Sequence, residues 1–316
     1  MTLRLVCLAL LWLLCGSSSR AAADVVLLLA EPYGRAAGFN PTGHVGVYLT
    51  RVCADTPTSL RRCRDGEVGA VVSRYNKVGD FDWAAVPLLP YLYGVTQAAD
   101  VPVTTTPADV RALREAYRQA HLRDLIPDDV ATRHQRWWQL IGAAYDRQFV
   151  AISVTTTAAQ DDRLIEALNA GENRHRFNVL FRNCADFARD VINDHYYPGA
   201  LGNNLIADLG VTTPKQVARA LARYGRRHVD VDLTAFVIPQ VPGHRPPSPR
   251  ARGVLESFLR VKKYSIPLAA VQPWVPVGLA AGYLTTGRFN PHRLATHTLA
   301  PEDLERQARQ GVIDLR

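Results

Sequence analysis

A cysteine at the start of a predicted helix is the residue best placed in this sequence to act as a nucleophile. Cys184 follows Asn183, a favoured N-cap residue, and begins a stripe of apolar residues at helical spacing within 177–192. A helix N-terminus concentrates partial positive charge and unpaired N–H groups, which lower the pKa of a thiol and can bind a developing oxyanion. The segment therefore predicts a reactive thiolate, with an oxyanion site at the helix start around Asn183.

A nucleophilic cysteine needs a base within hydrogen-bond reach, and His44 is the histidine best placed to supply it. It stands at the mouth of an alternating, strand-like segment, and Gly43 and Gly46 let another backbone or a substrate come close. Spacing alone leaves a plainer interpretation open. An isolated cysteine is usually a small buried hydrophobic residue, and an isolated histidine is usually solvated or bonded to backbone.

Two short motifs in this order resemble the circularly permuted NlpC-like branch of papain-fold cysteine enzymes. They are Gly-His-Val-Gly-Val-Tyr-Leu at 43–49 and, much later, Asn-Cys-Ala-Asp-Phe at 183–187. The branch includes lecithin retinol acyltransferase-like proteins and exported bacterial hydrolases. The resemblance covers residues 24–200 in outline. It implies an α+β, papain-like core of permuted NlpC type with an antiparallel sheet, in which Cys184 attacks a carbonyl and His44 is the base.

The resemblance also implies a third polar residue on the strand after the histidine strand. Ser73 fills that place, and Tyr75 is next on the same face by strand alternation. A hydroxyl orients an imidazole less strongly than a second histidine, an asparagine or a carboxylate would, so the chain departs from the family's pattern here. The insertion 51–66 and the region 80–170 have no counterpart in the family that can be carried over.

The N-terminus predicts export. Residues 1–23 combine Arg4, an apolar run of about ten residues and the small-residue site 21–23, which is typical of a secretory signal peptide and too short for a membrane anchor. Cleavage leaves three cysteines in a compartment where thiols pair. Cys53 and Cys63 flank the polar stretch 54–62, which we interpret as a loop closed by their disulfide, and Cys184 is then the free thiol.

The composition bounds the partners. The chain has 316 residues, of which 47% are hydrophobic, and this composition excludes disorder, coiled coil and a disulfide-dense miniprotein. The formal net charge is +8. In an exported protein a basic surface suits anionic envelope polymers or lipid headgroups, although a scattered solvated surface is the favoured explanation of the charge. We find no nucleic-acid motif and no CxxC or HExxH spacing, so we expect no nucleic acid, no metal and no cofactor.

Periodicity predicts the elements that must position these residues. A capping box at Thr106 opens a helix, and the Trp137–Trp138 pair belongs to another, with a core role favoured over gripping a glycan or lipid. The expected strands are 24–30, 44–49, 67–75 and 149–155, and the expected helices are 107–123, 136–146, 157–168, 184–192, 213–225 (ended by Gly225) and 301–310.

The proline-rich stretch 239–250 predicts a boundary between a catalytic domain, 24–238, and a C-terminal extension, 251–316. The apolar segment 266–284 contains three prolines, which favours a buried or interfacial segment over a membrane span. We therefore expect a periplasmic or secreted cysteine hydrolase or acyltransferase, free or associated with the membrane, that acts on an amide or ester bond of a peptidoglycan peptide or a lipid. The alternative is a non-catalytic module of the same fold that binds cell wall or membrane.

Overall fold

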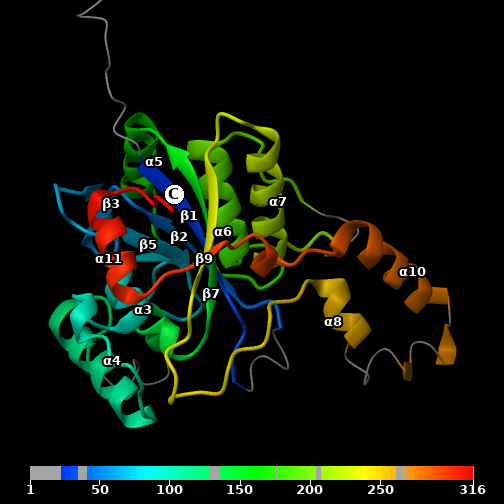
Figure 1. Cartoon of the computed structure of the whole chain (residues 1–316), viewed down its shortest axis with the longest axis horizontal. Coiled ribbons are helices and arrows are strands. Elements are labelled where there is room, and N and C mark those ends of the chain that lie inside the picture. The colour runs from blue at the N-terminus through cyan, green and yellow to red at the C-terminus, as the bar shows by residue number, and fades with distance from the viewer. Residues whose placement is uncertain are drawn as a thin grey trace, which may run out of the picture.

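The structure is a computed structural model that describes residues 23–34, 41–128, 136–174, 177–203, 208–260, 266–267, 270–272 and 274–315. The expected signal peptide, apart from Ala23, lies outside these residues. Figure 1 shows a central sheet with helices on both faces and a helical projection at one side. The chain is thus a mixed α/β protein whose large sheet is mainly antiparallel, which is compatible with the expected α+β class.

Seven strands form the sheet in the order β6-β5-β2-β1-β7-β8-β9. Every neighbouring pair is antiparallel except β8 and β9, which run parallel. All eight residues of the central strand β1 are buried, as a β-branched and leucine-rich run predicts. The strands are β1 Ala23–Ala30, β2 His44–Leu49, β5 Ala70–Arg74, β6 Trp83–Pro87, β7 Phe149–Thr156, β8 Leu233–Ile238 and β9 His297–Thr298.

Each face of the sheet carries its own hydrophobic core. Side chains alternate along β1, so Val25, Leu27 and Leu29 pack beneath α5, α6 and α7, while Val26 and Leu28 pack beneath α3, α4 and α11. The helices are α3 Leu88–Tyr93, α4 Pro107–His121, α5 Ala158–Ala170, α6 Cys184–Val191, α7 Pro214–Arg227, α8 Val254–Arg260, α10 Trp274–Gly282 and α11 Pro301–Gln310.

The stretch 54–62 differs from the expected loop. It belongs to a two-stranded hairpin, β3 Val52–Thr56 and β4 Ser59–Arg62, separate from the large sheet. Alternation was hidden because most of its side chains are polar and only its inner positions, such as Val52 and Leu60, are buried. The disulfide between Cys53 and Cys63 is present, as predicted, and it joins the two strands.

Two predicted helices need correction. Residues 136–146 form two 3₁₀ turns, Trp137–Leu140 and Ala143–Tyr145, because Gly142 between them adopts a left-handed conformation with φ 65°. Helix α7 runs through Gly225 to Arg227, so this glycine does not end the helix. A Cβ on Gly225 would meet Leu233 of β8 at 2.3 Å. That glycine therefore serves helix–sheet packing.

The capping box that opens α4 is present as predicted.

The chain after 239 returns to the body of the molecule. The stretch 239–250 has no regular element, yet Ser248 Oγ donates to Glu31 Oε2 at 3.0 Å and Val241 N donates to Ala144 O at 2.9 Å. Further on, β9 joins the sheet and α11 packs on it. Helix α10 projects into solvent with none of its described residues buried, contrary to the expected docking of 266–284 (Figure 1). No helix in the described part of the chain is long and apolar enough to span a membrane.

Candidate functional site

His44 is the first residue of β2, and its ring reaches the neighbouring strand β5. Strands β2 and β5 pair antiparallel, which brings Ser73 beside the start of β2. The Nε2 atom of His44 lies 3.1 Å from Ser73 Oγ, and the ring stacks on Tyr75 with 5.1 Å between ring centroids. The structure thus brings together three residues, His44, Ser73 and Tyr75, that the sequence singled out on two strands.

The hydrogen bonds of Ser73 determine which nitrogen of His44 carries the proton. The hydroxyl has one proton, and it donates that proton to the carbonyl oxygen of Val45 at 2.7 Å. Its oxygen must therefore accept from His44, so Nε2 carries the hydrogen and Nδ1 keeps the free lone pair. A base with its free nitrogen turned away from Ser73 is the arrangement that general base chemistry requires.

The glycines beside His44 serve the packing of the protein itself. A Cβ on Gly43, at φ 76°, would meet the carbonyl oxygen of Ala30 at 2.2 Å, and a Cβ on Gly46 would meet Val71 at 2.9 Å. The close approach expected at these positions is therefore made by β1 and β5. Both glycines keep the end of β2 close to its neighbours and so fix the position of His44.

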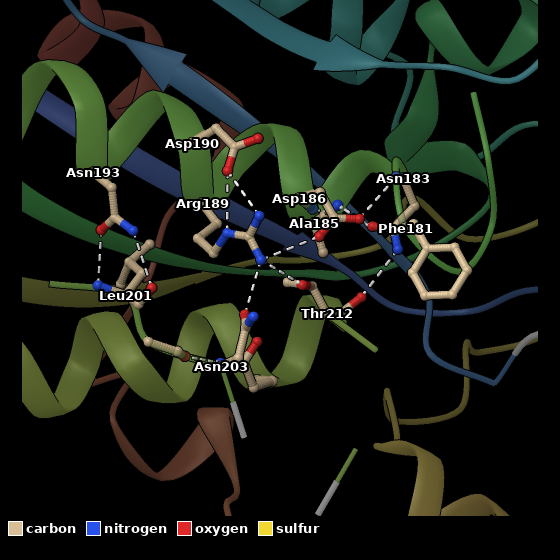
Figure 2. Close-up of polar contacts among 12 residues, drawn as sticks. Phe181, Asn183, Ala185, Asp186, Arg189, Asp190, Asn193, Leu201, Asn203 and Thr212 are labelled. Carbon is tan, nitrogen blue, oxygen red and sulfur yellow. Dashed lines mark hydrogen bonds and ion pairs between the residues drawn. The ribbon is translucent and has the colours of Figure 1, made fainter. Parts of the chain in front are cut away.

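Cys184 begins α6 on the other face of the sheet, and Asn183 caps that helix. The Asn183 Oδ1 atom accepts from the N–H groups of Ala185 and Asp186, and Nδ2 donates to the carbonyls of Val179 and Thr212. Asp186 completes a capping box by accepting from the Asn183 N–H at 3.0 Å (Figure 2). Because Nδ2 already donates to the two carbonyls, the side-chain amide of Asn183 is not free to bind an oxyanion.

Burial controls the charge of both candidate catalytic groups. Loss of hydration raises the pKa of the Cys184 thiol to about 11, despite hydrogen bonds from the backbone of Val45, Cys184 and Ala185. Burial, and then the positive charge of Arg147, lowers the pKa of His44 to about 3. The expected lowering of the thiol pKa is thus wrong for the free protein, because desolvation of the sulfur outweighs the backbone N–H groups near it.

One cavity of about 600 Å³ is bordered by both Cys184 and His44. The described residues include no direct hydrogen bond between the sulfur and the imidazole. The Val45 backbone contacts both Cys184 and Ser73. The full lining is Pro32, Tyr33, Gly34, Gly43, His44, Arg74, Tyr75, Asn76, Arg136, Trp138, Gln139, Arg147, Phe177, Val179, Cys184 and Arg245.

Several cavity residues were not found from the sequence. Four arginines line it, and none of them belongs to a local pattern that points to a site. Of the tryptophan pair, Trp137 packs against the core, whereas Trp138 borders the cavity. Hence the core interpretation holds for one tryptophan only.

Arg74 connects the strand of Ser73 to the helix of Cys184. It forms a bidentate, buried ion pair with Asp82, with distances of 2.9 and 2.7 Å. Its third contact is the Asn183 carbonyl at 3.4 Å, and its guanidinium lies 5.3 Å from the centre of the Phe187 ring. Arg74 therefore positions the start of α6 against β5.

The described residues offer no separate metal centre at this cavity. Their one cluster of potential ligands, Cys53, Cys63 and Glu67, contains the two disulfide-bonded sulfurs, which cannot act as thiolates.

Comparisons with known proteins add little. No protein-family description and no curated protein matches the chain. Among solved structures it is similar to the crystal structure of a type VI secretion system effector, TseH, at 14% identity and a TM-score of 0.31, over 69% of this chain and 94% of that one. A similarity this low defines neither the fold nor the activity.

Proposed function

We propose that the chain is an exported cysteine-dependent hydrolase or acyl-transfer enzyme with a papain-like core of permuted NlpC type. Cys184 is the nucleophile, His44 the base and Ser73 the residue that orients the base. The observation that carries the proposal is that Cys184 and His44 border one cavity while Ser73 Oγ lies 3.1 Å from His44 Nε2. The disulfide of Cys53 and Cys63 is typical of oxidising compartments outside the cytoplasm.

The first half of the reaction forms an acyl-enzyme. His44 Nδ1 takes the thiol proton of Cys184 as the sulfur attacks the carbonyl carbon of an amide or ester. The tetrahedral intermediate places a negative charge on the former carbonyl oxygen, and the backbone N–H of Cys184 is the donor we assign to it. The imidazolium then passes its proton to the leaving amine or alcohol, and a thioester on Cys184 remains.

The second half releases the acyl group. Water, or another acceptor, gives a proton to His44 Nδ1 as it attacks the thioester carbonyl, and the sulfur leaves and regains that proton. Because neutral imidazole and neutral thiol are the resting forms, the thiolate is generated during attack and not stored beforehand.

Two single variants test the assignment. Cys184→Ala and His44→Ala should each abolish turnover while the circular dichroism spectrum and melting temperature stay close to those of the parent. Incubation with purified peptidoglycan and, separately, with phospholipid vesicles, read by mass spectrometry, distinguishes a cell-wall peptide from a lipid acyl group. Full activity in either variant would refute the proposal.

A non-catalytic, surface-binding function remains the second candidate because of α10. Trp274 is 80% exposed and Val277 59% exposed on this projecting helix. The nearby C-terminal part borders a cavity lined by five arginines, Arg219, Arg223, Arg226, Arg227 and Arg288. Apolar side chains beside cationic ones suit the surface of an anionic membrane.

Cosedimentation with vesicles that contain phosphatidylglycerol tests this second function. Truncation after 240 would also remove β9 and α11 from the body, so point variants are the sharper tool. The double variant Trp274→Ala/Val277→Ser should lose binding, whereas Cys184→Ala and the control Val103→Ser, at a position 89% exposed elsewhere, should keep it. Equal binding by all of these proteins would exclude α10 as the contact.

A further inference from the structure

Arg147 is a buried cation beside the candidate nucleophile, and no carboxylate of the described residues pairs with it. Its side chain lies in the same cavity as Cys184 and His44, and the residue is 4% exposed. Within the described part of the chain it makes no ion pair, and its Nε atom is buried without a hydrogen-bond partner. Its guanidinium lies over the Tyr33 ring, whose centre is 4.4 Å from the guanidinium carbon.

The neighbouring acid is already occupied. Asp146 precedes Arg147 in the chain, but its carboxylate pairs with Arg114 at 2.6 Å, with Arg245, and with His244 at 3.2 Å. The described residues that line the cavity include four arginines and no aspartate or glutamate. Two of those arginines, Arg74 and Arg245, have their own carboxylates, so Arg147 is the buried one without a carboxylate among the described parts of the chain.

An unpaired cation in a buried site has a high free energy, since a ring face compensates only part of its lost hydration. An anion that enters the cavity would supply the missing partner, and a guanidinium binds the oxygens of a carboxylate or phosphate in a bidentate manner. We propose that the substrate of this site carries an anionic group, a carboxylate or a phosphate, which pairs with Arg147 while its acyl carbon lies at Cys184. That the ligand is a substrate rests on the proposed function, whereas the anion-binding site itself does not depend on it.

The electrostatics of the cavity agree with this assignment. The charge of Arg147 contributes to the low pKa of His44. A bound anion would offset that charge and make the imidazole a better base when the substrate is in place. A neutral acyl group would leave both the buried charge and the weak base unchanged.

Alkylation of Cys184 tests the anion site without any turnover. Iodoacetate and iodoacetamide differ mainly in the charge of one group, and Cys184 is the free cysteine of the described residues. The ratio of their alkylation rates, iodoacetate over iodoacetamide, is measured by mass spectrometry in the folded parent and in parent unfolded by guanidinium. We expect the folded parent to exceed the Arg147→Gln variant by about fivefold in this ratio, as a partly screened charge interaction would give.

Two further variants separate Arg147 from the general field of the cavity. Arg147→Lys should keep part of the preference, and Arg136→Gln, which removes an exposed arginine of the same cavity, should change the ratio less than about twofold. An equal ratio in the parent and a folded Arg147→Gln variant would overturn the inference, as would an equal drop in Arg136→Gln.

Protection of the parent protein decides the matter if Arg147→Gln does not fold. Inorganic phosphate or acetate, at constant ionic strength set with chloride, should slow alkylation by iodoacetamide, and the more effective anion indicates a phosphate or carboxylate substrate. Protection by neither anion overturns the inference. A protein that shows the anion preference but turns over no acyl substrate would contradict the proposed function and leave the anion site in place.

Discussion

Cys184 and His44 are both neutral near pH 7 in the free protein. Desolvation disfavours the thiolate and the imidazolium alike, and the positive charge of Arg147 offsets only part of this effect for the thiolate. The free protein therefore holds no preformed thiolate–imidazolium ion pair, and proton transfer from Cys184 to His44 has to accompany the attack on substrate. The chemistry at the residue scale therefore depends on how the imidazole is held.

The pH dependence of alkylation follows from the burial of Cys184. We expect the rate with iodoacetamide to rise with an apparent pKa near 11, above the 9.0 of an unperturbed thiol. A folded-state pKa above the unfolded value also means that this group's contribution to stability is complete below pH 9 and is lost as the pH rises through 11. Rates measured from pH 7 to 11 check this. An apparent pKa below about 8.5 would show a preformed thiolate and contradict the expectation.

Removal of the Ser73 hydroxyl should affect the rate and not binding. Ser73→Ala leaves His44 Nε2 without its 3.1 Å partner, so the imidazole loses its fixed tautomer and orientation. We expect kcat to fall about tenfold, equivalent to roughly 1.4 kcal/mol of activation free energy, with KM little changed. Steady-state kinetics measure both. Ser153→Ala, at a buried serine of β7, is the matched control, and an equal decrease there would assign the effect to general destabilisation.

At the scale of elements, the N-terminal turn of α6 is where several segments meet. Asn183 ties it to the loop at Val179 and to Thr212, and Arg74 ties it to β5. Figure 2 shows that Arg189 extends this network, with Nη1 donating to Thr212 Oγ1 at 2.9 Å and to Asn203 at 2.8 Å. These contacts hold the helix start, and with it Cys184, in place.

Asn183→Ala should therefore impair both stability and activity. It removes the cap of α6 and two hydrogen bonds to neighbouring segments, so we expect the free energy of unfolding to fall by about 1–2 kcal/mol. Turnover should fall as well, because Cys184 is the next residue. Thr106→Ala removes a comparable cap from α4 and is the control. Denaturant unfolding and kinetics on both variants give the test, and full activity in Asn183→Ala would show that the cap does not position Cys184.

At the scale of the whole molecule, the two ends of the described chain meet at β1. Ile313 N donates to Asp24 Oδ2 at 2.6 Å, and Arg51 donates to the Gln310 carbonyl at 2.9 Å. In contrast, α10 leaves the body and exposes its apolar side chains. The region after 251 therefore has two parts. Strand β9 and helix α11 complete the sheet and one of its cores, whereas α10 projects from the body.

Two single substitutions distinguish those parts. Leu304 of α11 is 1% exposed, so Leu304→Ala should lower the free energy of unfolding by about 2–4 kcal/mol. Val277→Ala on α10, at a position 59% exposed, should change it by less than about 0.5 kcal/mol. Chemical denaturation of the full chain measures both. Equal small effects would indicate that α11 belongs to an independent extension, as the expected division at 239–250 proposes.

The sequence by itself determined the local structure around the site. The alternation at 44–49, the apolar run at 149–155 and the caps at Thr106 and Asn183 depend on neighbours in the chain, and all were predicted correctly. The pairing of Cys53 with Cys63 also followed from the cysteine count together with the polar stretch that the two residues flank. The 3₁₀ turns at 137–145 and the strand β8 were missed, since both take their form from packing against distant segments.

Only the tertiary structure decided the charge states and the spatial neighbours of the candidate catalytic residues. Whether a thiol pKa rises or falls depends on how much water reaches the sulfur and on which backbone N–H groups and charges lie near it. The cavity, and Arg147, which has no carboxylate partner among the described residues, arise where β2, α6 and the segment before β7 converge. Burial and long-range pairing are properties of the folded chain as a whole, because they are made by residues far apart in sequence.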